Sequence, residues 1–360
     1  MRAFVLRSPH LDGEPGEYPE GIAIEAVRQA PRRIRQAGAF LVAAAGGAYS
    51  PRLYASRRLR DTVRAAALSE RPAWVVAQSY HVARAALGTG APSWVDFHNV
   101  DSRIWERLGD AGGGSAPARL FARVQAPRVR AFERDALRRA GGASCVSALD
   151  AETLAAIGGA PTAPLVVPNG VDLARYAVRR EAPSSELVVF VGDLTWAPNV
   201  DGIRWFRRRV WPAVKRLRPG ARAEVLGRGG GRLGLDAEDF ALLGAGGDTR
   251  PLWGRAGVAV VPLFAGGGTR LKILEAAASG VPVVSTRVGA EGLSFEAERE
   301  ILLRDDPEQF ASAVAALLAR PEAAARQAAA ARARVERSYD WKRIGAAFAG
   351  ELARRAERRA

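Results

Sequence analysis

Cysteine and histidine are scarce in this chain of 360 residues, which contains Cys145, His10, His81 and His98 and no others of either type. A single cysteine cannot form an intramolecular disulfide, which favours a reducing compartment. So few sulfur and imidazole ligands also exclude the common zinc clusters, and we predict no metal site. We interpret Cys145 as a small buried apolar residue.

Long apolar runs are also missing. The longest, residues 37–49, is short and interrupted by glycines, whereas a membrane-spanning helix needs about 20 apolar residues. The first residues lack the continuous apolar core of a signal peptide. We therefore expect a cytoplasmic protein, bound at most peripherally at the inner face of a membrane.

Acidic residues are outnumbered, because 38 Asp and Glu accompany 53 Lys and Arg and the formal net charge is +15. Nucleic acid, an anionic membrane and an anionic substrate are the partners that such a charge suggests. The basic residues are spread along the chain without a nucleic-acid-binding motif, so we predict no nucleic-acid partner. In the densest cluster, residues 119–139, arginines and apolar residues alternate at helical spacing. This pattern favours the solvated face of an ordinary helix, and a membrane-surface patch is the alternative.

The second half of the chain alternates apolar runs with segments of helical periodicity. The length suits two domains, and 48% hydrophobic with 25% charged residues is typical of a folded protein. We predict strands at residues 187–192, 223–227, 240–244, 258–263 and 281–286. We predict helices at residues 200–217, 249–255 and 269–279, and further helices in 307–360 with breaks before Pro321 and near 339–341. The alternation predicts a parallel, doubly wound α/β sheet.

The first half is less regular. We predict strands at residues 73–77, 93–97, 143–146 and 164–167, and helices at 54–68 and 116–140. Residues 1–40 give no strand order, and the Pro- and Gly-rich residues 8–21 predict a loop.

The segment with the clearest chemistry is residues 262–293, PLFAGGGTRLKILEAAASGVPVVSTRVGAEGL. Gly266, Gly267 and Gly268 follow a predicted strand, and a predicted helix begins at Thr269. Glycines there let backbone N–H groups approach a ligand, and the helix N-terminus adds partial positive charge. The segment therefore predicts an anion site at the end of a strand.

Charged side chains follow the glycines. Arg270 and Lys272 are predicted in the first helical turn, where cations oppose the helix dipole at a cost of a few tenths of a kcal/mol. An anion between them and the backbone would offset that cost. Glu275, one turn further on, can accept hydrogens from two hydroxyl groups. Together these residues predict a diphosphate beside a ribose, in preference to a glycine-rich turn with merely solvated cations.

The string GGGTRLKILEAAASGVPVVST resembles the donor-binding segment of the family 4 (group 1) glycosyltransferases. The resemblance extends to VFVGDLTWAPNVDGIRWF at residues 189–206, VVPNGVD at 166–172 and DFHNVDSRIWERL at 96–108. It covers about residues 95–340 in the family's order and is strongest to a subgroup that makes exopolysaccharides and related glycans.

This resemblance implies the GT-B fold, in which two Rossmann-like, doubly wound domains face each other across a cleft. It implies an acceptor-side domain over residues 1–168, shortened at its start, and a sugar-nucleotide-binding domain over 169–340. Residues 341–360 match the family's C-terminal helix, which crosses back to the first domain.

The resemblance also implies roles for single residues. Glu275 matches the glutamate expected on the donor ribose, whereas Gly267 replaces the glutamate that would contact the donor sugar. Gly192, Asp193 and Asn199 belong to the other loop of the donor site. With no Arg and Lys in that loop, charge compensation for the departing diphosphate is expected from Arg270, Lys272 and the backbone amides of 267–270.

Three further features follow from the resemblance. His98 matches a histidine near the donor sugar, which we expect to position the sugar rather than act as a general base. Trp196 either stacks on a sugar face or fills the loop. Residues 244–253 correspond to the segment that holds the nucleobase through backbone groups.

The start of the chain departs from the family, which begins with a strand, a glycine-rich loop, a helix and a second strand. No matching loop is visible in the first forty residues. A reduced domain, a start further upstream and lost activity are the three explanations left open.

Two functions of different class follow. The first is a retaining glycosyltransferase, without metal or cofactor, that moves a hexose from a nucleotide-diphosphate sugar to a glycan, lipid-linked or small natural-product acceptor. The second is a catalytically silent GT-B homologue that binds nucleotide or a partner protein as a scaffold. The donor half favours the first, and Gly267 with the shortened first domain favours the second.

Overall fold

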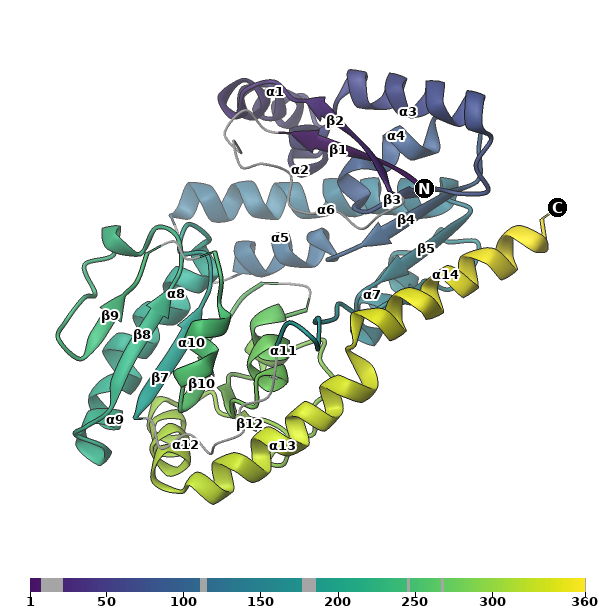
Figure 1. Cartoon of the computed structure of the whole chain (residues 1–360). Helices are drawn as coiled ribbons and strands as arrows, with labels where there is room; N and C mark the ends of the chain where they lie inside the picture. The colour runs from purple at the N-terminus through teal and green to yellow at the C-terminus, as the bar shows by residue number, and fades with distance from the viewer. Residues whose placement is uncertain (8–21, 111–114, 177–185, 245–246, 267–268, 360) are drawn as a thin grey trace. The chain divides into compact units, whose positions relative to one another are not determined.

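The computed structural model describes residues 1–7, 22–110, 115–176, 186–244, 247–266 and 269–359 (Figure 1). Contacts group the chain into two compact units. The first unit comprises Met1–Val167 with Leu352–Ala360, and the second comprises Pro168–Glu351.

The second unit contains a parallel sheet with the strand order β12-β11-β10-β7-β8-β9. Its strands are β7 (Leu187–Val191), β8 (Arg222–Leu226), β9 (Phe240–Leu242), β10 (Val258–Val261), β11 (Val283–Ser285) and β12 (Leu302–Leu303). The central strands are almost wholly buried, because helices cover both faces of such a sheet, and this is why they are continuous apolar runs in the sequence. The parallel α/β prediction is confirmed for this unit.

Helices of the second unit lie where the periodicity predicts them. They are α8 (Ala197–Trp205), α9 (Trp211–Leu217), α10 (Arg250–Arg255), α11 (Leu271–Ala278), α12 (Pro307–Ala319) and α13 (Pro321–Ser338). The predicted helix 200–217 starts earlier, at Ala197, since Pro198 suits a first turn. It also contains a π-helical turn at Phe206–Val210.

One predicted helix start is wrong. Helix α11 begins at Leu271, and Arg270 before it has φ −85° and ψ 87°, which is not helical. Thr269 and Arg270 therefore belong to the loop, and only Lys272 lies in the first turn. Gly280 follows the helix with φ 72°, as predicted for a helix C-terminal glycine.

The first unit contains a parallel sheet with the order β3-β4-β5-β6 and a separate parallel pair, β1 with β2. The strands are β1 (Arg2–Arg7), β2 (Ala23–Arg28), β3 (Val75–Ala77), β4 (Ser93–Phe97), β5 (Gly142–Cys145) and β6 (Leu165–Val166). Its helices are α1 (Arg32–Ala44), α2 (Tyr49–Tyr54), α3 (Arg57–Glu70), α4 (Ala83–Leu87), α5 (Asp101–Asp110), α6 (Ala116–Arg139) and α7 (Ala148–Ile157).

The predicted helix 54–68 is in fact divided. Ser56 accepts a hydrogen bond from the Leu59 backbone N–H and caps α3, so Tyr54 ends the preceding helix α2. The prediction also missed β1 and β2.

The last helix, α14 (Trp341–Glu357), contributes residues to both units. Near its end, the Leu352 carbonyl accepts a hydrogen bond from Trp74 Nε1 at 2.9 Å. Beyond the helix, Arg359 Nη2 donates to the Gly141 carbonyl at 2.7 Å. Among the described residues, no helix combines the length and apolar character needed to cross a bilayer.

Candidate functional site

The strand order of the second unit reverses between β7 and β10. From β7 the chain adds β8 and β9 on one side, then returns to add β10, β11 and β12 on the other. Because β7 and β10 are parallel neighbours, their carboxyl ends meet at one edge of the sheet. Open α/β sheets bind ligands at such a reversal. The loops that leave β7 and β10 there contain most of the predicted donor-binding residues.

Asn199 and Lys272 lie in the first turns of α8 and α11, the helices that follow these two loops, and they connect the two. Lys272 Nζ donates to Asn199 Oδ1 at 3.0 Å, and Asn199 Nδ2 donates to the Asp193 carbonyl at 2.9 Å. The Lys272 ammonium also lies 4.2 Å from the centroid of the Phe190 ring. The structure thus brings together residues that are 73 positions apart in the chain.

Gly192 leaves the space that the ammonium occupies. A Cβ at this position would come within 2.7 Å of Lys272 Nζ and 2.9 Å of Asn199 Nδ2. A larger residue at position 192 would therefore displace the Lys272 ammonium and the Asn199 amide from their present positions.

Gly266 has the same role in the loop after β10. Its φ is +121°, and a Cβ would lie 2.7 Å from the Trp196 ring and 2.9 Å from Arg270 Nη2. Trp196 is 39% exposed, whereas Arg270 is 6% exposed. The glycine therefore lets an aromatic ring at the rim and a buried guanidinium approach the same stretch of backbone.

Two cations lie close together in this site. Burial, followed by the nearby Arg270 guanidinium, lowers the pKa of Lys272 to about 7, and Glu275 opposes the shift. A bound anion would offset the repulsion between these two positive groups and favour the charged form of Lys272.

Asp193 is engaged within its own loop. Its Oδ1 accepts from the Thr195 backbone N–H at 2.9 Å and from Thr195 Oγ1 at 2.7 Å, and its Oδ2 accepts from Arg228 at 2.6 Å. Burial alone would raise its pKa, but these hydrogen bonds outweigh burial and lower the pKa below its usual value. The ionised carboxylate fixes the loop, and the Asp193 carbonyl orients Asn199.

Glu275 is held by residues that the sequence did not connect to it. Its Oε2 accepts from Thr249 Oγ1 at 3.0 Å and from Trp253 Nε1 at 3.1 Å. The Tyr176 hydroxyl lies 3.1 Å from Thr249 Oγ1 and extends this network. Thr249 and Trp253 belong to the stretch predicted near the nucleobase, whereas no sequence pattern indicated Tyr176.

Of the three glycines after β10, the structure describes Gly266. Gly267 and Gly268 lie outside the described residues. At Thr269, the hydroxyl is buried without a hydrogen-bond partner among the residues that the structure describes. Such a group is costly to bury unless a ligand or solvent molecule satisfies it.

His98 lies in the first unit, just after β4. Its Nε2 is 2.9 Å from Asp96 Oδ2, and Asp96 Oδ1 accepts from Ser144 Oγ at 2.5 Å. Ser144 Oγ in turn accepts from Trp94 Nε1 at 2.9 Å. The hydrogen bond to Asp96 raises the pKa of His98 although burial opposes it. Asp96 therefore fixes the orientation of the ring, and half of the His98 side chain remains exposed to solvent.

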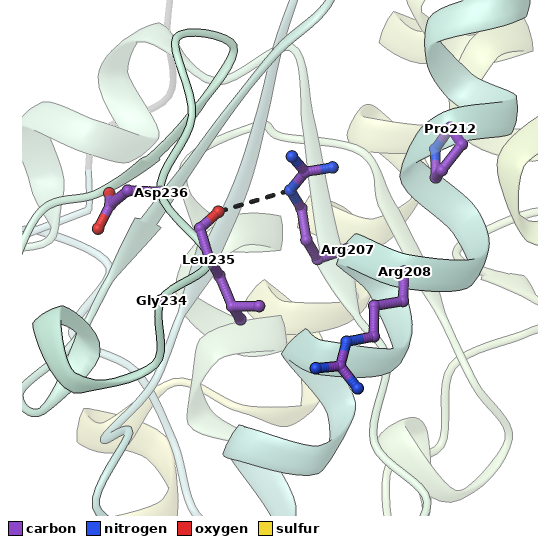
Figure 2. A pocket seen from close by; sticks show the side chains of 6 residues that line it. All are labelled: Arg207, Arg208, Pro212, Gly234, Leu235 and Asp236. Carbon is purple, nitrogen blue, oxygen red and sulfur yellow. Dashed lines mark hydrogen bonds between the residues drawn. The ribbon is translucent and has the colours of Figure 1, made fainter.

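A separate pocket of about 390 Å³ lies elsewhere in the second unit, beside the π-helical turn (Figure 2). Arg207, Arg208, Pro212, Gly234, Leu235 and Asp236 line it. Arg207 Nε donates to the Leu235 carbonyl at 3.5 Å. None of these residues belongs to the predicted donor site.

Two protein-family models match this chain, one over each half. Residues 185–320 match the family described as "Glycosyl transferases group 1". Residues 5–170 match the family described as "Glycosyl transferase 4-like domain". The second match includes β2 and the second half of β1, two strands that no sequence pattern indicated.

Curated relatives and solved structures agree with this assignment. Glycogen synthase from Mycobacterium tuberculosis is 31% identical over 204 residues, which cover 51% of this chain and 47% of that protein. The chain thus spans about half the length of this relative. Sucrose-phosphate synthase from Thermosynechococcus elongatus has a TM-score of 0.73 at 16% identity, covering 100% of this chain and 89% of that one. HepE from Anabaena, solved with UDP-glucose, has a TM-score of 0.67 at 16% identity, covering 98% and 99%. At such low identity the two structures show the fold alone, and they confirm the GT-B prediction.

Proposed function

Because the chain belongs to the group 1 glycosyltransferases, we propose that it moves a hexose from a nucleotide-diphosphate sugar to a hydroxyl group of a glycan, lipid-linked or small-molecule acceptor, with retention of configuration. The observation that carries this proposal is the pairing of Lys272 with Asn199 beside Gly192, at the reversal of the parallel sheet. A partly buried cation where these two strand-end loops meet is suited to a diphosphate.

The donor's diphosphate would lie against Arg270, Lys272 and the backbone amides of Thr269 and Arg270. Negative charge on the leaving nucleotide grows in the transition state, and preorganised cations and N–H groups stabilise that charge most strongly there. The lowered pKa of Lys272 would rise again as the diphosphate binds. Thr269 would satisfy its buried hydroxyl on the same ligand.

The ribose would approach Glu275. Thr249 and Trp253 both donate to Oε2 and so fix the orientation of the carboxylate. The ribose hydroxyls would then donate to Oε1. Because the family's sugar-contacting glutamate is absent at Gly267, we propose that His98, oriented by Asp96, positions the donor sugar.

Uridine nucleotides are the first donors to test, since the similar HepE was solved with UDP-glucose. We propose that transfer needs no metal ion. The family that the chain resembles transfers sugars without a metal ion, and an unchanged rate in the presence of EDTA is the expected result.

The experiment is to incubate the protein with UDP-, GDP- and dTDP-hexoses and to measure nucleotide release and sugar transfer. Lys272→Met should lower both by roughly tenfold or more, because it removes a charge-assisted contact. The exposed Lys342→Met is the matched control and should leave both unchanged.

A catalytically silent scaffold is the competing function. Gly267, where the family has a glutamate, favours it. The transferase function is contradicted if no donor releases its nucleotide and if Glu275→Ala binds nucleotide as the unaltered protein does. The scaffold function would then remain.

We also propose a peripheral membrane contact through the start of α6. Leu120 is 64% exposed and Val124 41% exposed on one face of this arginine-rich helix. The ring of the exposed Phe40, on α1, lies 5.7 Å from that of Phe121 and extends the apolar area. Apolar side chains flanked by arginines are typical of helices that lie on anionic lipid.

A further inference from the structure

The pocket beside the π-helical turn has no part in the proposed donor site (Figure 2). It lies between the turn Phe206–Val210 and the loop that contains Gly234, Leu235 and Asp236. Its volume of about 390 Å³ falls within the range of small-molecule sites, which is roughly 300–1,000 Å³. The pocket is therefore large enough for a small metabolite.

The turn that forms one wall of the pocket departs from α-helical geometry. The Trp211 N–H donates to the Phe206 carbonyl, five residues earlier in the chain. Pro212 follows, and because it has no N–H it cannot donate to the Arg208 carbonyl as an α-helix requires. Such widened turns are rare and are frequently found at functional sites. Here the widened turn contributes two consecutive cations, Arg207 and Arg208, to the pocket.

Arg207 is held in place before any ligand binds. Its Nε donates to the Leu235 carbonyl at 3.5 Å, and its guanidinium carbon lies 5.2 Å from the centroid of the Phe240 ring. Among the described residues, no hydrogen bond occupies its two Nη groups. A guanidinium fixed in this way loses less side-chain entropy when it binds a ligand.

Arg208 adds a second guanidinium to the same pocket and is exposed to solvent. Within the part of the chain that the structure describes, no carboxylate forms an ion pair with either arginine. Asp236 also lines the pocket, but its Oδ1 accepts from the Leu242 backbone N–H at 2.8 Å. Figure 2 shows its carboxylate pointing away from both guanidinium groups. One wall of the pocket therefore presents positive charge to a ligand.

We infer that Arg207 and Arg208 bind the phosphate group of a small phosphomonoester in this pocket. Guanidinium groups donate paired hydrogen bonds to phosphate oxygens, and two of them balance the nearly double negative charge of a phosphomonoester. The organic part of the ligand has room beside Gly234, where nothing lies within 4 Å of an added Cβ. The inference is independent of the proposed function, since a transferase and a silent scaffold could both contain this site.

Calorimetric titration of the full chain tests this site, with UDP present at saturating concentration so that the proposed donor site is occupied. Glycerol 3-phosphate and glucose 6-phosphate are the probes, and inorganic phosphate and glucose are their controls. We expect at least one phosphomonoester to bind with one-to-one stoichiometry and more tightly than either control. Absence of binding by both phosphomonoesters overturns the inference. Equally tight binding of inorganic phosphate also contradicts it, because the organic part would then contribute nothing.

Two neighbouring substitutions show whether the pocket itself binds the probe. Arg208→Gln should weaken the binding by roughly tenfold, because it removes a charge-assisted contact. Arg209→Gln removes the same charge from the next residue, which is exposed but lies outside the pocket lining, and should bind as the unaltered protein does. Equal affinity in the two variants would assign the binding to net positive charge and overturn the inference. Since both residues are exposed, misfolding is an inadequate explanation of a difference between them.

Discussion

Lys272 is the residue whose charge depends most on what occupies the site. Burial and Arg270 lower its pKa to about 7, and a bound diphosphate would raise it. Between the pKa values of the free and bound states, binding therefore takes up a proton, and nucleotide affinity falls as the pH rises above about 7. Calorimetry of UDP binding at pH 7.5, in buffers of different ionisation enthalpy, should show this uptake.

The control for this prediction is Lys272→Met, in which affinity should be weaker and proton uptake reduced. Equal proton uptake in Lys272→Met and the unaltered protein would assign the effect to another group.

His98 depends on its neighbour in a comparable way. The hydrogen bond to Asp96 raises the pKa of His98 against the opposing effect of burial. In Asp96→Asn we expect that pKa to fall below the value in the unaltered protein, since burial then acts without the carboxylate. An NMR titration of the His98 imidazole in the unaltered protein and in Asp96→Asn measures both values, and an equal pKa in the two proteins would contradict the role of Asp96.

At the scale of elements, the ends of β7 and β10 are close because glycines leave room. Gly192→Ala would place a Cβ 2.7 Å from Lys272 Nζ, so we expect UDP binding to weaken by roughly tenfold through loss of a charge-assisted contact. Gly254→Ala in α10 is the matched control, because nothing lies within 4 Å of the added atom. Equal affinity in both variants, measured by calorimetry, would contradict the arrangement of these loops.

Helix α6 contains a carboxyl group whose burial disfavours its ionised form. Glu133 is fully buried and accepts from the Ser102 backbone N–H of α5 at 3.2 Å. Burial raises its pKa to about 7. Since the folded state then binds the proton more tightly than the unfolded chain, stability falls as pH rises from about 4.5 to 7.

Glu133→Gln should remove this pH dependence. At 1.4 kcal/mol per pKa unit, the variant should gain roughly 3 kcal/mol over the unaltered protein between pH 5 and pH 8. The difference in unfolding temperature between the two proteins at each pH measures this gain. A difference that does not change with pH would show that Glu133 is ionised throughout.

The second unit was predictable because its elements have strong local patterns. Strands such as β7 and β10, buried on both faces, are unbroken apolar runs. The pattern of the segment after β10 predicted Lys272 at an anion site, and the family resemblance implied that Gly192 and Asn199 belong to the same site. The start of α11 was misplaced since Thr269 and Arg270 are polar residues compatible with either a loop or a first turn. The contacts of Glu275 with Thr249 and Trp253 depend on tertiary packing that no spacing encodes.

The first unit was less predictable for a physical reason. In β2, Val27 is the buried residue and the others are partly or fully exposed, so the strand lacks an apolar signature. The contact between His81 and Asp101 could not be predicted because these residues are 20 positions apart. Only the parallel pairing of β3 with β4 brings them together.

At the scale of the whole molecule, the net charge of +15 attracts the chain to anionic surfaces in any orientation. Charge alone would give binding that salt abolishes and that no single apolar residue controls. The exposed Leu120 and Val124 of α6 add a directional contribution, because apolar side chains inserted below the headgroups resist salt.

Vesicle sedimentation distinguishes the two contributions. We expect the protein to sediment with vesicles of phosphatidylglycerol and phosphatidylcholine, but not with phosphatidylcholine alone. Leu120→Gln with Val124→Gln should reduce binding at physiological salt by at least tenfold, since full burial of each large apolar side chain contributes roughly 1.5–3 kcal/mol and each 1.4 kcal/mol is about a tenfold change in affinity. Leu68→Gln, which changes an equally exposed leucine on α3, is the control and should bind as before. If all variants bind alike and salt releases each of them, the attraction is the nonspecific effect of net charge and α6 is an ordinary solvated helix.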